Sequence, residues 1–361
     1  MSQTESPAEE RALRVRAILA AARRLVDADD PLGREARRLL PAATGLSDAG
    51  VELGLSRHLE TSASDQEIEL LAHRAGAAPR VHVLLSANVF VGVVRAVALA
   101  VAASTSVRIR PSSREAVIAP LLLRAVADAG ALSDVELCER LEPRAGDLVH
   151  VYGRRDTITA VTRESPPGVR VVGHGPGFGV AFIDAESRTL DLAAERMSWD
   201  VIAFDQRGCL SPRVALVDGS PEAVEVFAEA LASELEKRER EVPRGSLADD
   251  ERSEQILYRS TASAVGRCHI GPTSSVGVDV SPRGLPLPPP GRNVHVARVS
   301  STDDFERLLA PFRGAITCIG HHGETSRARE LLHFAHGARS QCLGKMQSPP
   351  LDGPADLRGM L

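Results

Sequence analysis

Aromatic residues are scarce in this sequence, at 3% of its 361 positions, so its hydrophobic cores must be built mainly from Leu, Val, Ala and Ile. No apolar run reaches the roughly 18 residues that a membrane-spanning helix requires. The first residues also lack the charged and then apolar pattern of a signal peptide. We therefore expect a cytoplasmic protein with no membrane insertion.

Charge and cysteine usage exclude further classes of protein. The net charge is −5 and no basic tract occurs, so the composition gives no support for nucleic-acid binding. The five cysteines form no CxxC pair and are widely spaced, which argues against a disulfide framework or a zinc knuckle. Several histidines lie near Cys318, but their spacing matches no familiar site, so we expect no bound metal.

The first part of the chain has the pattern of amphipathic helices. Residues 6–9 have the form of a capping box, and apolar residues then recur on one helical face as far as Val26. Further helices are expected over 32–40 and 65–76. We expect this helical region, residues 1–76, to pack on the body of the protein. A subunit contact is the alternative.

From residue 80 the pattern alternates between strands and helices. The near-continuous apolar run 81–85 is typical of a strand buried on both faces of a parallel sheet. Similar strands are expected at 106–110, 148–152 and 169–172, with helical segments between them. This alternation predicts βαβ units, whose parallel sheets bind cofactors at the carboxyl ends of the strands. The sequence contains no G-x-G-x-x-G fingerprint, which disfavours a common Rossmann dehydrogenase.

Cys209 is the strongest candidate for a nucleophile. It lies in the polar segment Asp205-Gln206-Arg207-Gly208-Cys209-Leu210-Ser211-Pro212, just before a short strand expected at 214–217. Gly208 allows the backbone to turn tightly, so that the thiol can face a cleft. A buried structural cysteine is the alternative and the default for any single cysteine. The polar loop argues against that alternative.

The segment around Cys209 resembles the nucleophile signature of the LuxC-type acyl-CoA reductases, which belong to the aldehyde dehydrogenase superfamily. Similar motifs precede it in the same order, namely Ser86-Ala87-Asn88, Arg110-Pro111-Ser112-Ser113, Tyr152-Gly153-Arg154-Arg155-Asp156 and His174-Gly175-Pro176-Gly177. The resemblance implies an α/β protein of the aldehyde-dehydrogenase type. After the helical region we expect a nicotinamide-cofactor domain over 77–203, a catalytic α/β domain over 204–330 and a tail, 331–361, that returns to the cofactor domain.

The resemblance also implies roles for individual residues. Cys209 would take the acyl group, while Asn88 and the backbone N–H of Cys209 would hold the oxyanion. Taken alone, Asn88 is equally consistent with a turn residue. His174 stands where hydrolytic members of the superfamily carry the Glu that activates water. Without that base, hydrolysis should be slow, although His174 itself could act as an acid or base.

Arg110 and Ser113 stand where the superfamily usually has a Lys and a Glu that address the adenosine ribose. Loss of the carboxylate removes repulsion of a ribose 2′-phosphate, and an Arg can bind that phosphate through two hydrogen bonds. The cofactor expected is therefore NADPH. Ser112, Gly153 and Gly175 lie in the same set of motifs, and we assign them to the cofactor site as well. A merely solvated Arg110 is the alternative.

These inferences predict an NADPH-dependent reduction of an acyl thioester to the aldehyde, and the resemblance implies that this thioester is a fatty acyl-CoA. The acyl donor is expected to be acyl-CoA or an acyl-carrier thioester, with a homo-oligomer or an acyl-transferring partner protein as a possible assembly. Three alternatives stay open: an NAD(P)+-dependent aldehyde dehydrogenase, a cofactor-free acyl-transfer or acyl-binding protein, and a non-catalytic assembly protein on the same fold.

Overall fold

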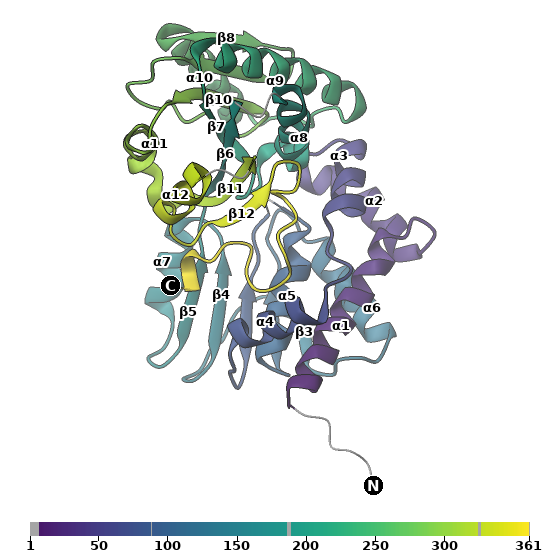
Figure 1. Cartoon of the computed structure of the whole chain (residues 1–361). Coiled ribbons are helices and arrows are strands. Elements are labelled where there is room, and N and C mark those ends of the chain that lie inside the picture. The colour runs from purple at the N-terminus through teal and green to yellow at the C-terminus, as the bar shows by residue number, and fades with distance from the viewer. Residues whose placement is uncertain (1–6, 88, 186–188, 324–325, 361) are drawn as a thin grey trace.

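The computed structural model of the chain describes residues 7–87, 89–185, 189–323 and 326–360. They form two α/β bodies, each built around its own β-sheet, with the last part of the chain lying between them (Figure 1). Among the described helices, none combines the length and the apolar character needed to cross a membrane.

The N-terminal region is helical, as expected. Its helices are α1 (Pro7–Val26), α2 (Pro31–Thr44), α3 (Asp48–Leu53) and α4 (Asp65–Ala75), with a π-helical turn at Gly54–His58. Helix α4 begins with a capping box, in which the Ser64 hydroxyl accepts from the N–H of Glu67 and the Glu67 carboxylate accepts from the N–H of Ser64. Helix α1 packs along α5 (Gly92–Ala103) and α6 (Ile118–Asp128), so this region belongs to the first body.

The first sheet is fully parallel. Its strands are β1 (Val81–Leu84), β2 (Val107–Arg110), β3 (Val135–Leu137), β4 (Leu148–Tyr152) and β5 (Arg170–His174), in the order β3-β2-β1-β4-β5. The strand order runs one way from β1 to β3 and the opposite way from β3 to β5. Right-handed crossovers therefore place α5 and α6 on one face and α7 (Arg155–Glu164) on the other.

The crossover from β3 to β4 runs on the same face as α7, because it moves across the sheet in the same direction. It consists of residues 138–147, all of them described, and they form turns and loops without a helix. Among the described residues, this crossover therefore places a loop and no helix over the face of β1 and β2 on the α7 side.

The second sheet has seven strands in the order β12-β11-β6-β7-β10-β9-β8, and only β8 runs antiparallel to its neighbour. The strands are β6 (Phe178–Asp184), β7 (Pro212–Asp218), β8 (Arg267–Ile270), β9 (Ser275–Asp279), β10 (Asn293–Val299), β11 (Ile316–His322) and β12 (Arg339–Cys342). The helices are α8 (Leu190–Ile202), α9 (Pro221–Glu241), α10 (Asp249–Val265), α11 (Thr302–Leu309) and α12 (Ser326–Phe334), with 3-10 turns at Ala203–Gln206, Ala310–Ala315 and Arg358–Met360.

The sheets divide the chain earlier than the sequence-based boundary at residue 203. Strand β6 and helix α8 already belong to the second body, since β6 pairs with β7 and β11. The segment 331–361 likewise begins inside that body, because β12 is its edge strand. An apolar run identifies a strand but not the sheet that the strand joins, which is why the sequence misplaced both boundaries.

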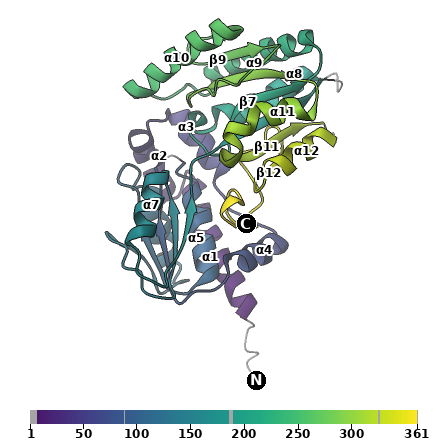
Figure 2. The ribbon, with the colours of Figure 1, turned by 90° about the vertical axis from the view of Figure 1, so that its left-hand side faces the viewer.

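After β12 the chain leaves the second sheet. Leu343 and Met346 still pack in the core of the second body, and only from about Pro349 does the chain reach the first body (Figure 2). Arg95 of α5 donates hydrogen bonds to the carbonyl oxygens of Pro349, Pro350 and Gly353, each at 2.8 Å. The same guanidinium pairs with Glu60. This buried arginine therefore fastens the C-terminal segment, residues 343–360, to the helices of the first body.

Candidate active site

Cys209 lies where the two sheets face each other. It precedes β7, so it stands at the amino edge of the second sheet, and its carbonyl oxygen accepts a hydrogen bond from the hydroxyl of Thr317 in β11. The segment that follows β1 approaches from the carboxyl edge of the first sheet. A Cβ atom on Gly208 would lie 3.5 Å from Cγ2 of Val89. This edge is where parallel α/β sheets bind their ligands.

The backbone before the cysteine is in an unusual conformation. Phe204, Asp205 and Gln206 have φ angles of 53°, 50° and 64°, in the left-handed region that residues with a side chain rarely adopt. Each such residue costs on the order of 1–2 kcal/mol. Three in succession persist only if their surroundings hold them in place.

Asp205 supplies the first of these restraints. One oxygen of its carboxylate accepts two hydrogen bonds from the buried Arg292, at 3.0 and 2.7 Å. The other oxygen accepts from the N–H of Gly245 at 2.9 Å, and the Asp205 carbonyl accepts from the N–H of Gly291 at 3.0 Å. The residue is thus fixed by side-chain and backbone groups that lie far along the chain.

Gln206 supplies the second restraint. Its amide nitrogen donates to the carbonyls of Pro212 and Asn293, at 2.7 and 2.8 Å, and its amide oxygen accepts from the N–H of Asn293 at 2.8 Å. Arg207 then pairs with Glu251 at 3.0 Å. The polar residues of the motif therefore hold the loop. Sequence reasoning missed their partners Arg292 and Asn293, each of which lies 87 positions further along the chain.

Gly208 is required for a different reason from the one expected. Its φ angle is not positive, so the turn itself does not demand glycine. A Cβ atom there would lie 3.1 Å from both the Gln347 amide oxygen and the Ser211 hydroxyl. The small residue lets the C-terminal segment pack closely behind the cysteine.

The thiol of Cys209 is protonated at neutral pH in this structure. Its pKa is raised to about 11, mainly by burial and to a smaller extent by the Asp356 carboxylate, while Arg358 acts in the opposite direction. A resting thiolate would require surroundings that favour the charged form. Here dense packing around the sulfur outweighs the nearby cation.

His174 ends β5 and belongs to a stack of rings on the first sheet. Its imidazole lies parallel to the Tyr152 ring, with centroids 4.2 Å apart, and its Nε2 is 3.0 Å from Nδ1 of His150. Burial lowers the pKa of His174 to about 4, with a smaller contribution from Arg358. The ring is therefore neutral at neutral pH.

Tyr152 is the first residue of the motif Tyr152-Gly153-Arg154-Arg155-Asp156, but the sequence assigned no role to it. Its hydroxyl oxygen is buried and has no hydrogen-bond partner among the described residues. Burial is the main cause of its raised pKa, and Cys209 is one of the groups whose charge contributes. The Tyr152 hydroxyl is therefore protonated, and it lies close enough to Cys209 for the charge of the thiolate to affect its pKa.

The other residues expected at the site are distributed along the carboxyl edge of the first sheet. Asn88 lies outside the described residues. Arg110 is exposed at the end of β2, followed by Ser112 and Ser113. Gly153 follows β4, and Gly175 follows β5.

Two local contacts define this edge further. Arg358 donates to the carbonyl oxygens of Gly175 at 3.1 Å and Pro176 at 3.2 Å, which fastens the loop after β5 to the C-terminal segment. The carboxylate nearest to Arg110 in sequence, Glu115, is buried and accepts the N–H groups of Val117 and Ile118 at the start of α6. This carboxylate is therefore engaged by backbone N–H groups at the start of α6.

A group with metal-ligand spacing occurs elsewhere, on the second body. Glu225, Glu229 and His269 bring their ligand atoms within 4.8 Å of one another. Arg267 pairs with Glu225 at 2.9 Å and with Glu229 at 3.7 Å. A guanidinium already neutralises these carboxylates, so the group is adequately explained as a surface ion cluster.

Most of the chain matches the model of a known protein family. The family model of the acyl-CoA reductases (LuxC) matches residues 51–348, a span that includes the Cys209 loop and both sheets. This chain belongs to the acyl-CoA reductase (LuxC) family. The resemblance inferred from the motifs is thereby confirmed.

Two curated proteins are similar in sequence to parts of this LuxC-family chain. A long-chain acyl-protein thioester reductase of Aliivibrio fischeri is 25% identical over 174 residues, which are 48% of this chain and 36% of the relative. Long-chain acyl-protein thioester reductase 2 of Photobacterium leiognathi is 23% identical over 197 residues, 53% of this chain and 40% of the relative. The chain thus matches less than half the length of either relative.

Solved structures show the fold. A putative aldehyde dehydrogenase from Burkholderia cenocepacia superposes with a TM-score of 0.67 at 15% identity, covering 94% of this chain and 79% of that one. An oxidoreductase from Marinobacter aquaeolei gives a TM-score of 0.70 at 11% identity, covering 99% and 85%. The LuxC-family chain therefore has the aldehyde-dehydrogenase-like α/β fold that the sequence predicted.

Proposed function

We propose that this protein reduces an acyl thioester to an aldehyde, with NADPH as the hydride donor and Cys209 as the acyl carrier, in the cytoplasm. The observation that carries the proposal is the position of Cys209. A chain of the acyl-CoA reductase family holds this thiol between the two sheets, in a strained loop fixed by Asp205 and Gln206. A loop held at such cost is typical of functional sites.

The first step follows from the state of the thiol. The Cys209 sulfur attacks the thioester carbonyl, the bond from that carbon to the donor sulfur breaks, and the new bond to Cys209 forms. The thiol is protonated at neutral pH, since its pKa is raised to about 11. Its proton therefore leaves during the attack and finishes on the departing thiol, so the step is balanced without any further reactant.

The second step is the reduction. Bound NADPH would supply a hydride to the acyl carbon on Cys209. The carbon–sulfur bond would then break, the aldehyde would leave, and the Cys209 sulfur would take up a proton from water, which restores the thiol. The developing oxyanion needs donors, and we assign this role to the N–H of Cys209, to Asn88 and to the unpartnered hydroxyl of Tyr152.

His174 fits a positioning role better than that of a base. Its pKa is lowered to about 4, so its ring is a weak base, and it lies flat against Tyr152. A neutral imidazole in place of a carboxylate leaves no strong base to activate water. Hydrolysis of the acyl-enzyme is therefore slow, which favours reduction over aldehyde oxidation.

The carboxyl edge of the first sheet fits the phosphorylated form of the cofactor. Arg110 makes no ion pair within the described part of the chain, and Ser112 and Ser113 follow it with hydroxyl groups. The Glu115 carboxylate accepts hydrogen bonds from backbone N–H groups at the start of α6. Among the described residues this edge therefore offers a cation that no carboxylate pairs with, as a ribose 2′-phosphate requires.

The acyl donor is proposed as acyl-CoA or an acyl thioester on a carrier or partner protein. The names of the two curated relatives refer to acyl-protein thioesters, which favours a protein donor. An acyl-transferring partner or a second copy of the chain would then complete the assembly.

The test is NADPH consumption, followed by absorbance, with a panel of acyl-CoAs and an acylated carrier protein. Cys209→Ser should reduce turnover to background, whereas Cys342→Ser, at an exposed cysteine, should leave it unchanged. Acyl labelling of Cys209 without turnover would support an acyl-transfer protein instead. Reduction of NADP+ by aldehydes with release of acid would support an aldehyde dehydrogenase, and neither reaction would leave an assembly protein.

A further inference from the structure

The C-terminal segment, residues 343–360, contacts both the Cys209 loop and the loop that follows β5. At the first of these, the Gln347 amide donates to the Ser211 hydroxyl at 3.1 Å. At the second, Arg358 donates to two backbone carbonyl oxygens. The segment lies between the two bodies in Figures 1 and 2. Charged side chains near the end of the chain are thereby brought to the proposed active site.

Every N–H group of the Arg358 guanidinium has an acceptor. Nε donates to Oδ1 of Asp356 at 2.8 Å, and Nη2 donates to Oδ2 of the same carboxylate at 3.3 Å. The other three bonds go to the carbonyl oxygens of Gly175 at 3.1 Å, Pro176 at 3.2 Å and Gly314 at 2.9 Å. A guanidinium has five N–H groups, so none is left to bind a ligand. Arg358 is therefore fixed in place and acts on the site through its charge.

Gly177, the last residue of the motif that begins with His174, lets this guanidinium approach the cysteine loop. A Cβ atom on Gly177 would lie 3.1 Å from Nη1 of Arg358 and would collide with Cγ2 of Thr317. The guanidinium and Thr317 thus adjoin the same glycine. The Thr317 hydroxyl in turn donates to the carbonyl oxygen of Cys209. Arg358 therefore stands one hydrogen-bonded residue away from the backbone of the proposed nucleophile.

Asp356 is the counter-charge that holds Arg358. It is buried, and besides the two bonds from the guanidinium its carboxylate accepts the backbone N–H of Arg358 at 3.2 Å. A buried ion pair persists when its remaining groups are hydrogen-bonded in this way. The two charges do not cancel at the sulfur. The carboxylate raises the pKa of the Cys209 thiol, and the guanidinium lowers it by a smaller amount.

Other elements bring little charge to the thiol. Arg95 of α5 favours the thiolate more weakly than Arg358 does, and it is already paired with a carboxylate of the first body. The Tyr152 hydroxyl of β4 and the Cys318 thiol of β11 also interact with the sulfur, but burial raises the pKa of each, so both are neutral at neutral pH. His174 of β5 is neutral as well, since its pKa is lowered to about 4. Among the described residues, the two largest charge effects on the thiol therefore come from the C-terminal segment.

We propose that Asp356 and Arg358 are positioning residues that adjust the reactivity of Cys209 from the end of the chain. The carboxylate suppresses the thiolate in the resting protein. The guanidinium stabilises the thiolate that forms when the carbon–sulfur bond of the acyl-enzyme breaks and the bonding electron pair stays on sulfur, which then takes up a proton from water. This second role rests on the proposed function, whereas the effect on the free thiol does not. The C-terminal segment is thus a part of the site and not only a connection between the two bodies.

The test is the rate of alkylation of Cys209 by iodoacetamide at pH 8, quantified on the Cys209 peptide by mass spectrometry. The reagent is uncharged, so the substituted charges act on the thiol and not on the reagent. Asp356→Asn should increase the rate, and Arg358→Gln should decrease it, each by at least about threefold. Arg358→Lys keeps the charge but not the five hydrogen bonds, so it should recover most of the wild-type rate.

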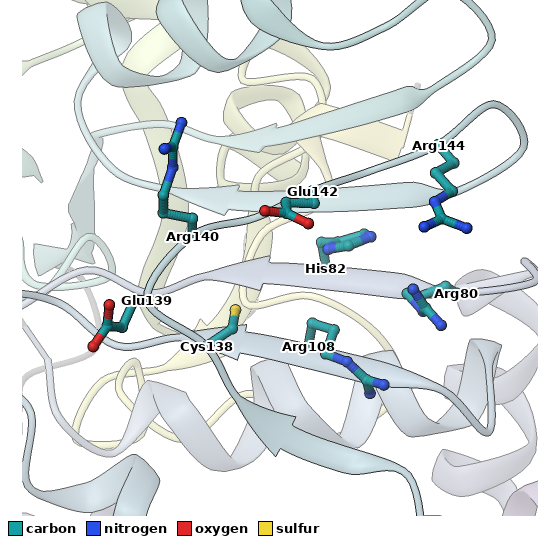
Figure 3. A pocket seen from close by; sticks show the side chains of 8 residues that line it. All are labelled: Arg80, His82, Arg108, Cys138, Glu139, Arg140, Glu142 and Arg144. Atoms are coloured by element: carbon teal, nitrogen blue, oxygen red, sulfur yellow. The ribbon is translucent and has the colours of Figure 1, made fainter.

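Three control variants separate charge from loosened packing. Asp352→Asn breaks the ion pair with Arg74, at 2.7 Å, on the same C-terminal segment. Arg144→Gln removes an exposed cation in a cavity on the first sheet, none of whose lining residues belongs to that segment (Figure 3). Arg240→Gln does the same at an exposed arginine of α9 in the second body. All three should stay within about twofold of the wild-type rate.

The sign of the change decides between the two roles of the pair. A pair that only holds the segment in place would expose the thiol when either partner is substituted, so both variants would react faster. That result, equal rates for Arg358→Gln and Arg358→Lys, or an effect of Asp352→Asn as large as that of Asp356→Asn overturns the proposal. Far-UV circular dichroism checks that each variant is folded. Because alkylation needs neither substrate nor cofactor, its failure is distinguishable from loss of Cys209-dependent reduction.

Discussion

Arg292 donates two hydrogen bonds to a single carboxylate oxygen of Asp205, at 3.0 and 2.7 Å. Both residues are almost fully buried, with 1% and 2% of their surfaces exposed. The pair connects the segment before β10 to the left-handed turn that leads to Cys209. It therefore couples the stability of the second body to the geometry of the proposed nucleophile.

Removing this cation should destabilise the protein strongly. Arg292→Gln leaves the Asp205 carboxylate buried without its partner, which typically costs about 3–5 kcal/mol. The free energy of unfolding from urea denaturation measures the change. Arg240→Gln is the matched control and should stay within about 0.5 kcal/mol of the wild type. Equal denaturation of both variants would show that the pair does not hold the loop.

Reactivity of Cys209 should increase steeply with pH. Because burial raises the pKa of the thiol to about 11, the thiolate fraction grows about tenfold per pH unit throughout the range below that value. Alkylation by iodoacetamide, quantified on the Cys209 peptide by mass spectrometry, should rise from pH 7 to pH 10 without a plateau. A plateau below pH 8 would contradict the protonated resting state.

Cofactor preference should depend on Arg110 and Ser113. Arg110→Ala removes the unpaired cation, so KM for NADPH should rise at least about tenfold while KM for NADH changes little. Ser113→Glu should act in the same direction by repelling the 2′-phosphate and accepting ribose hydroxyls. Steady-state kinetics with both cofactors measure the preference. An equal effect of either substitution on NADPH and NADH would exclude a 2′-phosphate contact at this edge.

The buried His295 should make the protein sensitive to acid. Burial lowers its pKa to about 4 from 6.5, so between these values the unfolded chain binds a proton that the folded protein does not. Its contribution to stability is therefore complete above about pH 6.5 and is lost as the pH falls toward 4. Burial of Asp200, whose pKa is raised to about 7, acts in the opposite direction.

A substitution separates these two groups. His295→Gln keeps a hydrogen-bonding side chain beside the Tyr258 hydroxyl, which lies 3.2 Å from Nδ1, but cannot titrate. The dependence of unfolding free energy on pH between 6.5 and 4.5 should shift by about one proton, or about 1.4 kcal/mol per pH unit. Identical slopes for wild type and variant would refute a neutral buried imidazole.

Much of the fold could be predicted from local pattern. Helix α4 was expected over 65–76 and spans Asp65–Ala75, because its start has a capping box and its end a glycine. The apolar strand β1 was equally clear. The edge strands β8 and β12 were missed, since Arg267–Ile270 and Arg339–Cys342 carry polar and apolar residues without a strand-like alternation. Edge strands are partly solvated and need no apolar pattern.

Part of the candidate site could also be predicted from local sequence pattern. Cys209 stood out because it lies in a polar loop and because the segment around it resembles a known nucleophile signature, and both signals are local. Its restraint by Arg292 was not predictable, because that residue is 87 positions from Asp205 and nothing in either segment specifies the other. The raised pKa of the thiol depends on the C-terminal segment folding back over it, which brings Asp356 and Arg358 close. Such long-range packing is not encoded in any local spacing.

The central claim is that an acyl group passes through Cys209 before it is reduced. The most direct measurement is intact-protein and peptide mass spectrometry after mixing the enzyme with an acyl-CoA or acylated carrier, first without and then with NADPH. The account predicts an acyl mass on the Cys209 peptide, absent in Cys209→Ser, which disappears on addition of NADPH as aldehyde is released. Turnover to aldehyde by Cys209→Ser, or an acyl mass that NADPH does not discharge, would contradict it.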